Sequence, residues 1–264
     1  MPATLAELRA TLNAIEGNGF RRRPALPFGI GAVDARLAGE GLRLDALHEV
    51  AGESTGLADD AAATLFLGGI AARAWGTVLW VASRRDLFAP GLVQVGLAAE
   101  RVLYAEAADD AEALAWMEEG LRHRGLGAVV GEVRRVGLPA TRRLQQAAEG
   151  GRTIALLLKR HGRSGTDPLG APSAAVTRWR IRCAPATTAS GRARWHVTLV
   201  RQLGGEPGEW RLAGCDATGR CALPVRSPAR LTRADAIAAP PEAATHRATI
   251  SREVTEACRA IKAA

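Results

Sequence analysis

The ten residues Glu49–Ala58, with the sequence EVAGESTGLA, constrain the fold of this chain more than any other stretch. They continue an apolar run, residues 46–50, that is typical of a buried strand, and they precede a small-residue run, 61–75, that is typical of a helix. A strand, a glycine-rich turn and a helix N-terminus in this order direct unpaired backbone N–H groups and a helix dipole towards an anion. The stretch therefore predicts the backbone of a phosphate-binding loop.

The side chains that would make such a loop work are missing. A working loop reads G-x-x-x-x-G-K-[ST], in which the lysine contacts the phosphates and the hydroxyl binds Mg²⁺. Here Ala51 replaces the first glycine, Gly56 keeps the second, and Leu57 and Ala58 occupy the Lys and Ser/Thr positions; two aspartates follow. We interpret the stretch as a degenerate nucleotide site made of Gly52, Glu53, Ser54, Thr55, Gly56, Leu57 and Ala58.

Length and composition narrow the class of protein. A chain of 264 residues can form one sizeable core with appendages. No apolar run approaches the ~20 residues of a membrane span, and the N-terminus lacks the basic region and apolar core of a signal peptide. The four cysteines, at positions 183, 215, 221 and 258, show no CxxC spacing and no metal-ligand partners. We expect a cytoplasmic protein with reduced thiols, no metal site and no cofactor.

Basic side chains are concentrated in one part of the chain. Residues 1–150 carry 16 basic and 19 acidic side chains, whereas residues 151–213 carry 11 and 3. The second segment contains the loop Lys159–Ser173, which is rich in glycine, proline and basic residues. Such a loop can follow a phosphate backbone without sequence preference, so Lys159, Arg160 and Arg163 are candidate DNA contacts. A charged, solvated loop without a ligand is the alternative.

The middle of the chain alternates apolar runs with helical patterns. Buried strands are expected at residues 42–50, 77–81, 101–105, 127–130 and 153–158, and helices include 109–122 and 139–149. This alternation predicts an α/β core with a mostly parallel central sheet flanked by helices. Three alternating segments, at 176–183, 195–202 and 209–212, predict antiparallel strands on the C-terminal side.

Each end of the chain carries an apolar stripe at helical spacing. The stripes consist of Leu5, Leu8, Leu12 and Ile15 near the N-terminus and of Ile250, Val254, Ala257 and Ile261 near the C-terminus. A marginal amphipathic helix on a tether is a common element for binding in a partner's groove; packing onto the chain's own core is the alternative. We therefore divide the chain into a helix and hinge (1–20), a core (21–213) and a flexible basic tail (214–264) that ends in a short helix.

Several motifs between residues 26 and 212 resemble the core of RecA and, more closely, the ImuA family. The most specific is LPFGIGAVDARLAGEGLRLDALHEVAGESTG (26–56), which is similar to RecA's short helix, strand ending in Glu and phosphate loop. The others are LWVASRRDLFAPGL (79–92), VVGEV (129–133), RRLQQAAE (142–149) and WHVTLVRQLGGEPGEWRL (195–212). The ImuA family consists of RecA-like accessory proteins of SOS mutagenesis. The resemblance implies a RecA-like fold.

The same resemblance implies a role in the response to DNA damage. It implies an adaptor for DNA repair by error-prone translesion synthesis, which bridges an ImuB-like Y-family-related protein, an error-prone polymerase and, as a further candidate, RecA. The sequence departs from RecA where catalysis would occur. Ser83-Arg84-Arg85-Asp86 stands where the catalytic glutamate is expected, and Gly131-Glu132 stands where a strand should end in a magnesium-binding aspartate. Without these groups phosphoryl transfer has no charge stabilisation, so we expect no catalytic residues.

Two other functions are compatible with the sequence. The ImuA family is related to the SulA inhibitors of cell division, which bind a tubulin-like GTPase. SulA proteins are generally shorter, so the basic loop and long tail of this chain count against that alternative. A weak nucleotide-binding RecA-like ATPase is the other alternative, and nucleotide binding at the turn between Gly52 and Gly56 would distinguish it. No other group of residues predicts a catalytic centre.

Overall fold

The computed structural model describes residues 24–123, 125–162, 165–185 and 192–224. Arg163 and the two apolar stripes predicted near the chain ends lie outside these ranges. Within them, no helix combines the length and the apolar character needed to cross a membrane.

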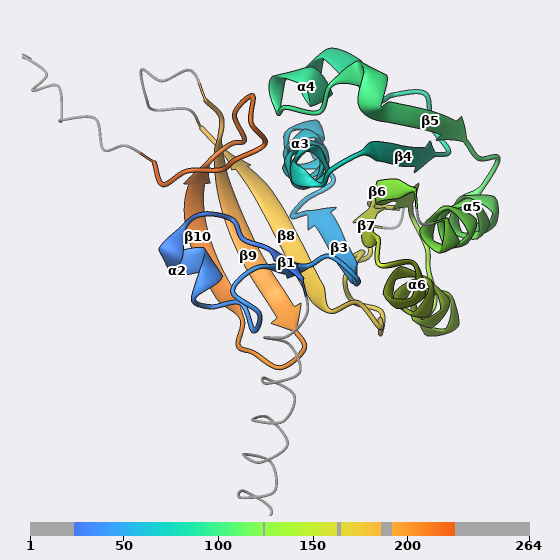
Figure 1. Ribbon diagram of the computed structural model, residues 1–264. Coiled ribbons are helices and arrows are strands. Elements are labelled where there is room, and N and C mark those ends of the chain that lie inside the picture. Colours follow the sequence, from blue (N-terminus) through green and yellow to red (C-terminus); the bar gives the residue numbers. More distant parts are fainter. Residues whose placement is uncertain (1–23, 124, 163–164, 186–191, 225–264) are drawn as a thin grey trace, which may run out of the picture. The chain divides into compact units, whose positions relative to one another are not determined.

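An eight-stranded sheet forms the centre of the described body, with the order β10-β9-β8-β3-β7-β6-β4-β5 (Figure 1). The six parallel strands are β3 (Leu47–Gly52), β4 (Thr77–Ala82), β5 (Val102–Glu106), β6 (Leu126–Val133), β7 (Ile154–Lys159) and β8 (Thr177–Ala184). Two antiparallel strands, β9 (Arg194–Gln202) and β10 (Gly208–Ala213), extend the sheet beyond β8. The predicted fold class, a mostly parallel sheet with antiparallel strands on the C-terminal side, is confirmed.

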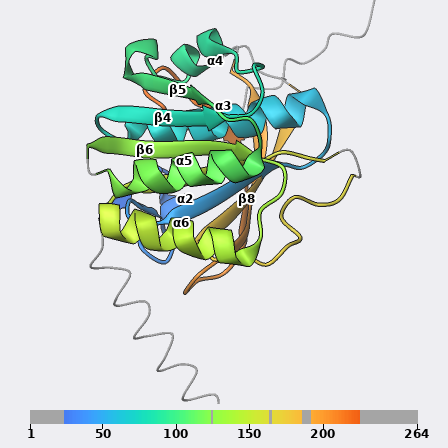
Figure 2. The same ribbon diagram turned by 90° about the vertical axis from the view of Figure 1, so that its right-hand side faces the viewer.

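Helices cover both faces of the parallel part of the sheet (Figures 1 and 2). One face carries α3 (Leu57–Arg73), and the other carries α5 (Asp110–Arg122) and α6 (Leu138–Gly151), which pack against each other. The middle strands β3 and β7 are buried at every position, which explains why they are mostly apolar rather than alternating. The polar exceptions are His48 and Glu49 in β3 and Lys159 at the end of β7. Two apolar cores result, one on each side of the sheet.

Local sequence signals account for where the elements begin. Asp109 caps α5, because its carboxylate accepts a hydrogen bond of 2.9 Å from the backbone N–H of Glu112. Shorter elements complete the body: β1 (Ala25–Leu26) pairs with β2 (Leu42–Arg43), and α2 (Gly31–Asp34), α4 (Ala89–Gln94) and the 3₁₀ turn Ala99–Arg101 connect the larger ones. Apolar side chains between residues 28 and 42 pack in the core on the α3 side of the sheet.

The end of the core lies later than the sequence suggests. We expected a flexible tail from residue 214, but residues 214–222 fold back as a strap, in which Ala213 bridges to Ala222 and Cys221 is buried in the α3-side core. This expectation is wrong for the strap because its apolar side chains find a packing surface on α3. The predicted helix within residues 250–263 lies outside the described part of the chain.

Candidate functional site

The predicted strand, turn and helix meet at the C-terminal end of β3. β3 ends at Gly52 and α3 begins at Leu57, so Gly52–Gly56 form the connecting loop. A Cβ on Gly52 would lie 3.1 Å from the carbonyl carbon of Asp59. The loop thus approaches the first turn of α3 closely, and a glycine permits that approach.

A carboxylate of the chain itself occupies this loop. Asp59 is buried, and its Oδ2 accepts hydrogen bonds from the backbone N–H of Ser54 (3.1 Å) and from the Ser54 hydroxyl (2.6 Å). Its Oδ1 accepts a third, of 2.8 Å, from the backbone N–H of Cys183 in β8. The backbone N–H of Glu53 is also used, because it donates to the carbonyl of Ile181 at 2.8 Å. An internal anion therefore takes the place at the helix N-terminus that a phosphate would need.

The two positions that would carry a cation and a hydroxyl face solvent. Leu57 stands at the lysine position with 86% of its surface exposed, and Ala58 is exposed beside it. Neither side chain can offset the charge of a phosphate or bind Mg²⁺. The apolar Leu57 instead lines an open cavity of about 560 Å³, together with Leu65, Leu87 and Phe88.

The place expected for a metal-binding carboxylate is occupied by an ion pair. Glu132, on β6, is 3% exposed, and its Oε2 accepts hydrogen bonds from Arg160 Nε (3.0 Å) and Nη2 (2.8 Å). Its Oε1 accepts one of 2.8 Å from the indole N–H of Trp80. Arg160 Nη1 also lies 3.3 Å from Asp60 Oδ2. Burial works against the charged form of Arg160, but the attraction of Glu132 and the hydrogen bonds to it outweigh this effect and raise its pKa.

These contacts leave Glu132 unable to act as a metal ligand without displacing an arginine. The residues therefore do not fit a bound nucleotide–Mg²⁺ complex. Among the described residues, no three histidine, cysteine, aspartate or glutamate side chains come together as metal ligands would. At the position of the expected catalytic base, Arg84 pairs with Asp86 (2.8 Å) and Arg85 pairs with Glu106 (2.7 Å).

Two of the three predicted DNA contacts are buried. Lys159 is the last residue of β7 and is 2% exposed, with its Nζ 3.8 Å from Glu49 Oε2; burial lowers the pKa of Lys159. Arg160 is 8% exposed and holds Glu132 as described. The interpretation that Lys159 and Arg160 lie in a solvated loop and can contact DNA is therefore wrong for this structure, because buried carboxylates attract both side chains inwards. Arg163 lies outside the described residues.

A buried polar network around Glu49 escaped the sequence analysis. Glu49 is fully buried, and its carboxylate accepts hydrogen bonds from the Ser173 hydroxyl (2.6 Å) and Arg178 Nε (2.8 Å). Arg178 also donates to the carbonyl of Ala171 at 2.9 Å. The network attaches the segment after β7 to the central strand. The sequence signal was an acidic residue, Glu49, within a mostly apolar strand.

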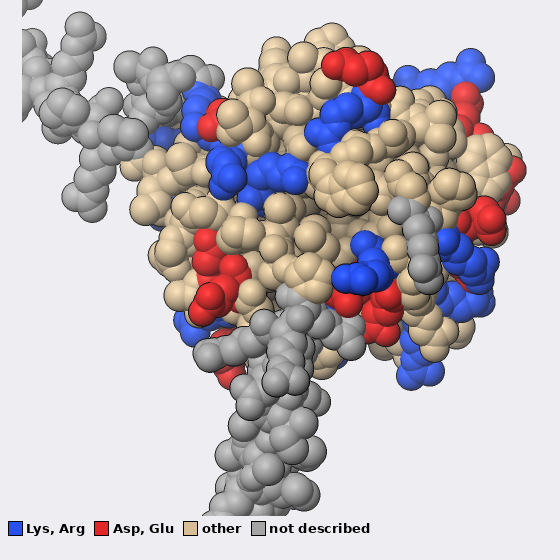
Figure 3. Space-filling model, in the orientation of Figure 1, with Lys and Arg blue, Asp and Glu red and all other residues tan. Residues whose placement is uncertain are grey.

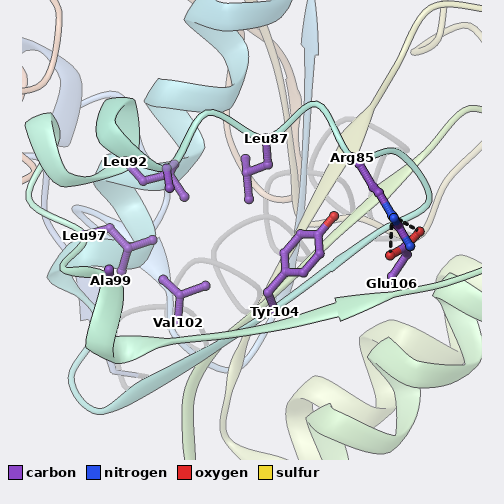
Figure 4. Close-up of a pocket in the computed structure, with 9 residues that line it drawn as sticks. Arg85, Leu87, Leu92, Leu97, Ala99, Val102, Tyr104 and Glu106 are labelled. Carbon is purple, nitrogen blue, oxygen red and sulfur yellow. Dashed lines mark hydrogen bonds and ion pairs between the residues drawn. The ribbon is translucent and has the colours of Figure 1, made fainter.

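A second cavity lies beside β5, the strand at the edge of the sheet (Figure 4). It measures about 440 Å³, and Leu92, Leu97 and Val102 line it. The ring of Tyr104 points into it, while the Arg85–Glu106 pair closes one end (Figure 4). No pattern in the sequence predicted this cavity, because its walls come from α4, the following 3₁₀ turn and β5.

The comparisons with known proteins agree with this picture. No protein-family model matches the chain. The crystal structure of the RadB recombinase superimposes with a TM-score of 0.55 at 17% identity, over 75% of this chain and 99% of that one, which shows a RecA-like fold. The crystal structure of SulA from Pseudomonas aeruginosa matches 44% of this chain and 98% of that one, with 26% identity and a TM-score of 0.38, too slight a likeness to indicate a shared function.

Similarity in sequence identifies the family, which the structural likenesses above do not. Protein ImuA of Caulobacter vibrioides, from strain NA1000 / CB15N and from strain ATCC 19089 / CIP 103742 / CB 15, is 39% identical to the chain over 229 residues. The match covers 82% of this chain and 93% of each relative. The chain belongs to the ImuA family.

Proposed function

We propose that this protein is a non-catalytic adaptor in damage-induced (SOS) translesion DNA synthesis, acting in the cytoplasm. It keeps the RecA-like body as a rigid support and lacks the chemistry of a nucleotide hydrolase. Membership of the ImuA family supports the biological setting. The contact between Arg160 and Glu132 supports the non-catalytic part, because a buried arginine pairs with the carboxylate at the position where magnesium would be expected.

The loop supports the same proposal independently. A nucleotide would have to expel the Asp59 carboxylate from its three hydrogen bonds before its phosphates could reach the loop amides. Asp59 is buried, so displacing its carboxylate would break three hydrogen bonds to a charged group, each of which contributes about 1.5–3 kcal/mol. Restoring a nucleotide site thus requires more than a lysine.

The proposed partners are an ImuB-like Y-family-related protein, an error-prone polymerase and RecA. We assign their binding to the apolar stripes outside the described body: Leu5, Leu8, Leu12 and Ile15, and Ile250, Val254, Ala257 and Ile261. Amphipathic segments of this kind bind by laying one apolar face into a groove. The folded body would then hold the two segments on one molecule, which raises the effective concentration of each partner for the other.

Weak, non-specific DNA binding is a second proposal, and we propose Arg134 and Arg135 as its contacts because both side chains are exposed. Arg134 and Arg135 follow β6 and are exposed, and their backbone N–H groups donate to Asp110 at 2.9–3.2 Å. Both arginines line a cavity of about 300 Å³. On the face shown in Figure 3, basic side chains are scattered among acidic and uncharged ones, which favours low affinity.

The nucleotide part is tested by measuring phosphate release from ATP and Mg²⁺ by the purified full chain. The control is Leu57→Glu, because it adds a negative charge at the phosphate position on a side chain that is almost fully exposed. We expect equal, background release from both proteins. Release by the unchanged protein that clearly exceeds that of Leu57→Glu would favour the weak ATPase instead.

The adaptor part is tested by affinity purification from cells with damaged DNA. The expected result is recovery of an ImuB-like protein and a polymerase with the tagged full chain. Recovery of a tubulin-like GTPase in their place would favour a SulA-like division inhibitor.

A further inference from the structure

Two cysteines far from the degenerate loop lie in contact. Cys215 Sγ and Cys221 Sγ are 3.4 Å apart, and both thiols are free. They stand at the two ends of the turn in the strap, residues 214–222. Backbone hydrogen bonds hold this turn closed, from Asp216 N to Arg220 O (3.1 Å) and from Gly219 N to Asp216 O (2.9 Å).

The strap is pressed against the backbone of α3, which keeps the sulfurs in place. A Cβ on Gly69 of α3 would lie 2.3 Å from Cys215 Sγ, and one on Gly219 would lie 2.5 Å from the Gly69 carbonyl oxygen. Cys221 is 8% exposed. Neither side chain can swing away from the other without lifting the strap, so the pair is preorganised for reaction.

A cation with an unused hydrogen-bond donor lies beside the two thiols. Arg73 interacts electrostatically with both sulfurs, its Nη1 donates to the carbonyl of Pro27, and its Nε is buried without a hydrogen-bond partner. A thiolate formed in this pair would be stabilised by the guanidinium. The hydrogen bond to Cys221 and burial raise the pKa of Cys215, and Arg73 opposes this rise.

We propose that Cys215 and Cys221 are an oxidation site that forms an intrachain disulfide with a peroxide. One thiolate attacks a peroxide oxygen; an S–O bond forms, the O–O bond breaks, and hydroxide leaves and takes up a proton. The second thiol then attacks the resulting sulfenic acid; the S–S bond forms, the S–O bond breaks, and water leaves. Two thiols and one hydrogen peroxide thus give one disulfide and two waters, and the two electrons pass to the peroxide.

The geometry requires little movement. The sulfurs must approach from 3.4 Å to a bond length of about 2.05 Å, which small rotations of the two side chains can supply. The product is a covalent loop around residues 216–220 that fixes the strap on α3.

The chain offers a specific readout. Trypsin cleaves after Arg211, Arg220 and Arg226, which places the cysteines in the separate peptides LAGCDATGR and CALPVR. The native full chain is treated with hydrogen peroxide, quenched, alkylated in denaturant with N-ethylmaleimide and digested. We expect the two peptides to be recovered as one disulfide-linked species that reduction separates.

Variants and stability controls make the test decisive. Cys183→Ser should keep the linked species, whereas Cys215→Ser should abolish it and leave Cys221 alkylated. The melting temperature of the native protein should rise on oxidation and return on reduction, and that of Cys215→Ser should not change. The proposal is overturned if both cysteines stay alkylatable at peroxide concentrations that oxidise other sites, or if the linked species forms only after denaturation.

Discussion

Arg160 donates two hydrogen bonds to a single oxygen of Glu132, at 2.8 and 3.0 Å, across neighbouring parallel strands. Both side chains are almost completely buried. In this arrangement the arginine supplies from within the chain the positive charge that a metal ion would otherwise supply. The same pair joins the residue after β7 to β6, so it contributes to the stability of the fold.

Removing the arginine should destabilise the protein strongly. Arg160→Ala leaves Glu132 buried without its cation, and breaking such a pair costs about 3–5 kcal/mol. The free energy of unfolding in urea should fall by that amount. Arg135→Ala, at an exposed position, is the control and should change it little. Adding Glu132→Gln to Arg160→Ala should restore part of the loss; no recovery would show that packing rather than charge is the cause.

Acid should destabilise the protein through His48. This side chain is fully buried; its Nε2 donates to the carbonyl of Arg43 (2.8 Å), and its Nδ1 accepts from the Thr177 hydroxyl (2.7 Å). Burial lowers the pKa of His48 from 6.5 to about 4. The unfolded chain therefore takes up a proton between those pH values that the folded chain cannot accept, so stability falls as the pH falls through this window.

The difference between the two pKa values corresponds to a loss of roughly 3 kcal/mol in the free energy of unfolding. This loss is complete at pH values below the lower pKa. His48→Gln keeps an amide donor but cannot titrate, so its stability should depend less on pH in this window. His196→Gln, at a half-buried position on β9, should retain the wild-type loss. Urea unfolding at several pH values between 7 and 4 measures both; identical profiles for His48→Gln and the unchanged protein would refute the assignment.

Restoring the missing loop residues alone should not restore nucleotide binding. The exposed positions Leu57 and Ala58 accept Leu57→Lys and Ala58→Thr without disturbing the core. The Asp59 carboxylate would still hold the loop N–H of Ser54, and Arg160 would still hold Glu132. Titration with a fluorescent ATP analogue and Mg²⁺ should therefore show no saturable binding. Micromolar affinity in the double variant would contradict the view that Asp59 closes the loop.

The salt dependence of DNA binding should respond to Arg134 and Arg135. If both side chains contact phosphates, replacing both with alanine should weaken binding to any sequence and flatten the slope of log K against log salt by up to about two units. Arg142→Ala, an exposed position on α6, is the control. An unchanged slope in the double variant would assign the two arginines to solvent.

The C-terminal stripe should serve a partner rather than the core. Deleting residues 245–264 should leave the melting temperature nearly unchanged and abolish co-purification with the translesion or recombinase partner. Val254→Asp should act like the deletion because it places a charge on the apolar face, whereas Thr255→Asp, away from that face, should not. A melting temperature lowered by many degrees with partner binding intact would place the segment in the core.

The sequence alone was sufficient for the fold class, and it predicts a degenerate nucleotide site. Both depend on local information. The alternation of apolar runs with helical patterns specifies a parallel sheet. Leu57 and Ala58 stand where a phosphate-binding loop has a lysine and a hydroxyl, and this difference can be read without knowing the neighbours. The resemblance to the ImuA family was found in the same stretches, because several short motifs in a fixed order identify a family better than the overall composition does.

Tertiary structure alone decided which charges are available and which side chains meet. Lys159 and Arg160 belong to a segment that reads as a basic, solvated loop, yet each is drawn inwards by a carboxylate from another strand, Glu49 or Glu132. The spacing of Cys215 and Cys221 suggests nothing until the strap folds back on α3 and brings their sulfurs together. The sequence determines which groups exist, whereas burial and charge depend on neighbours that only the packing of the sheet supplies.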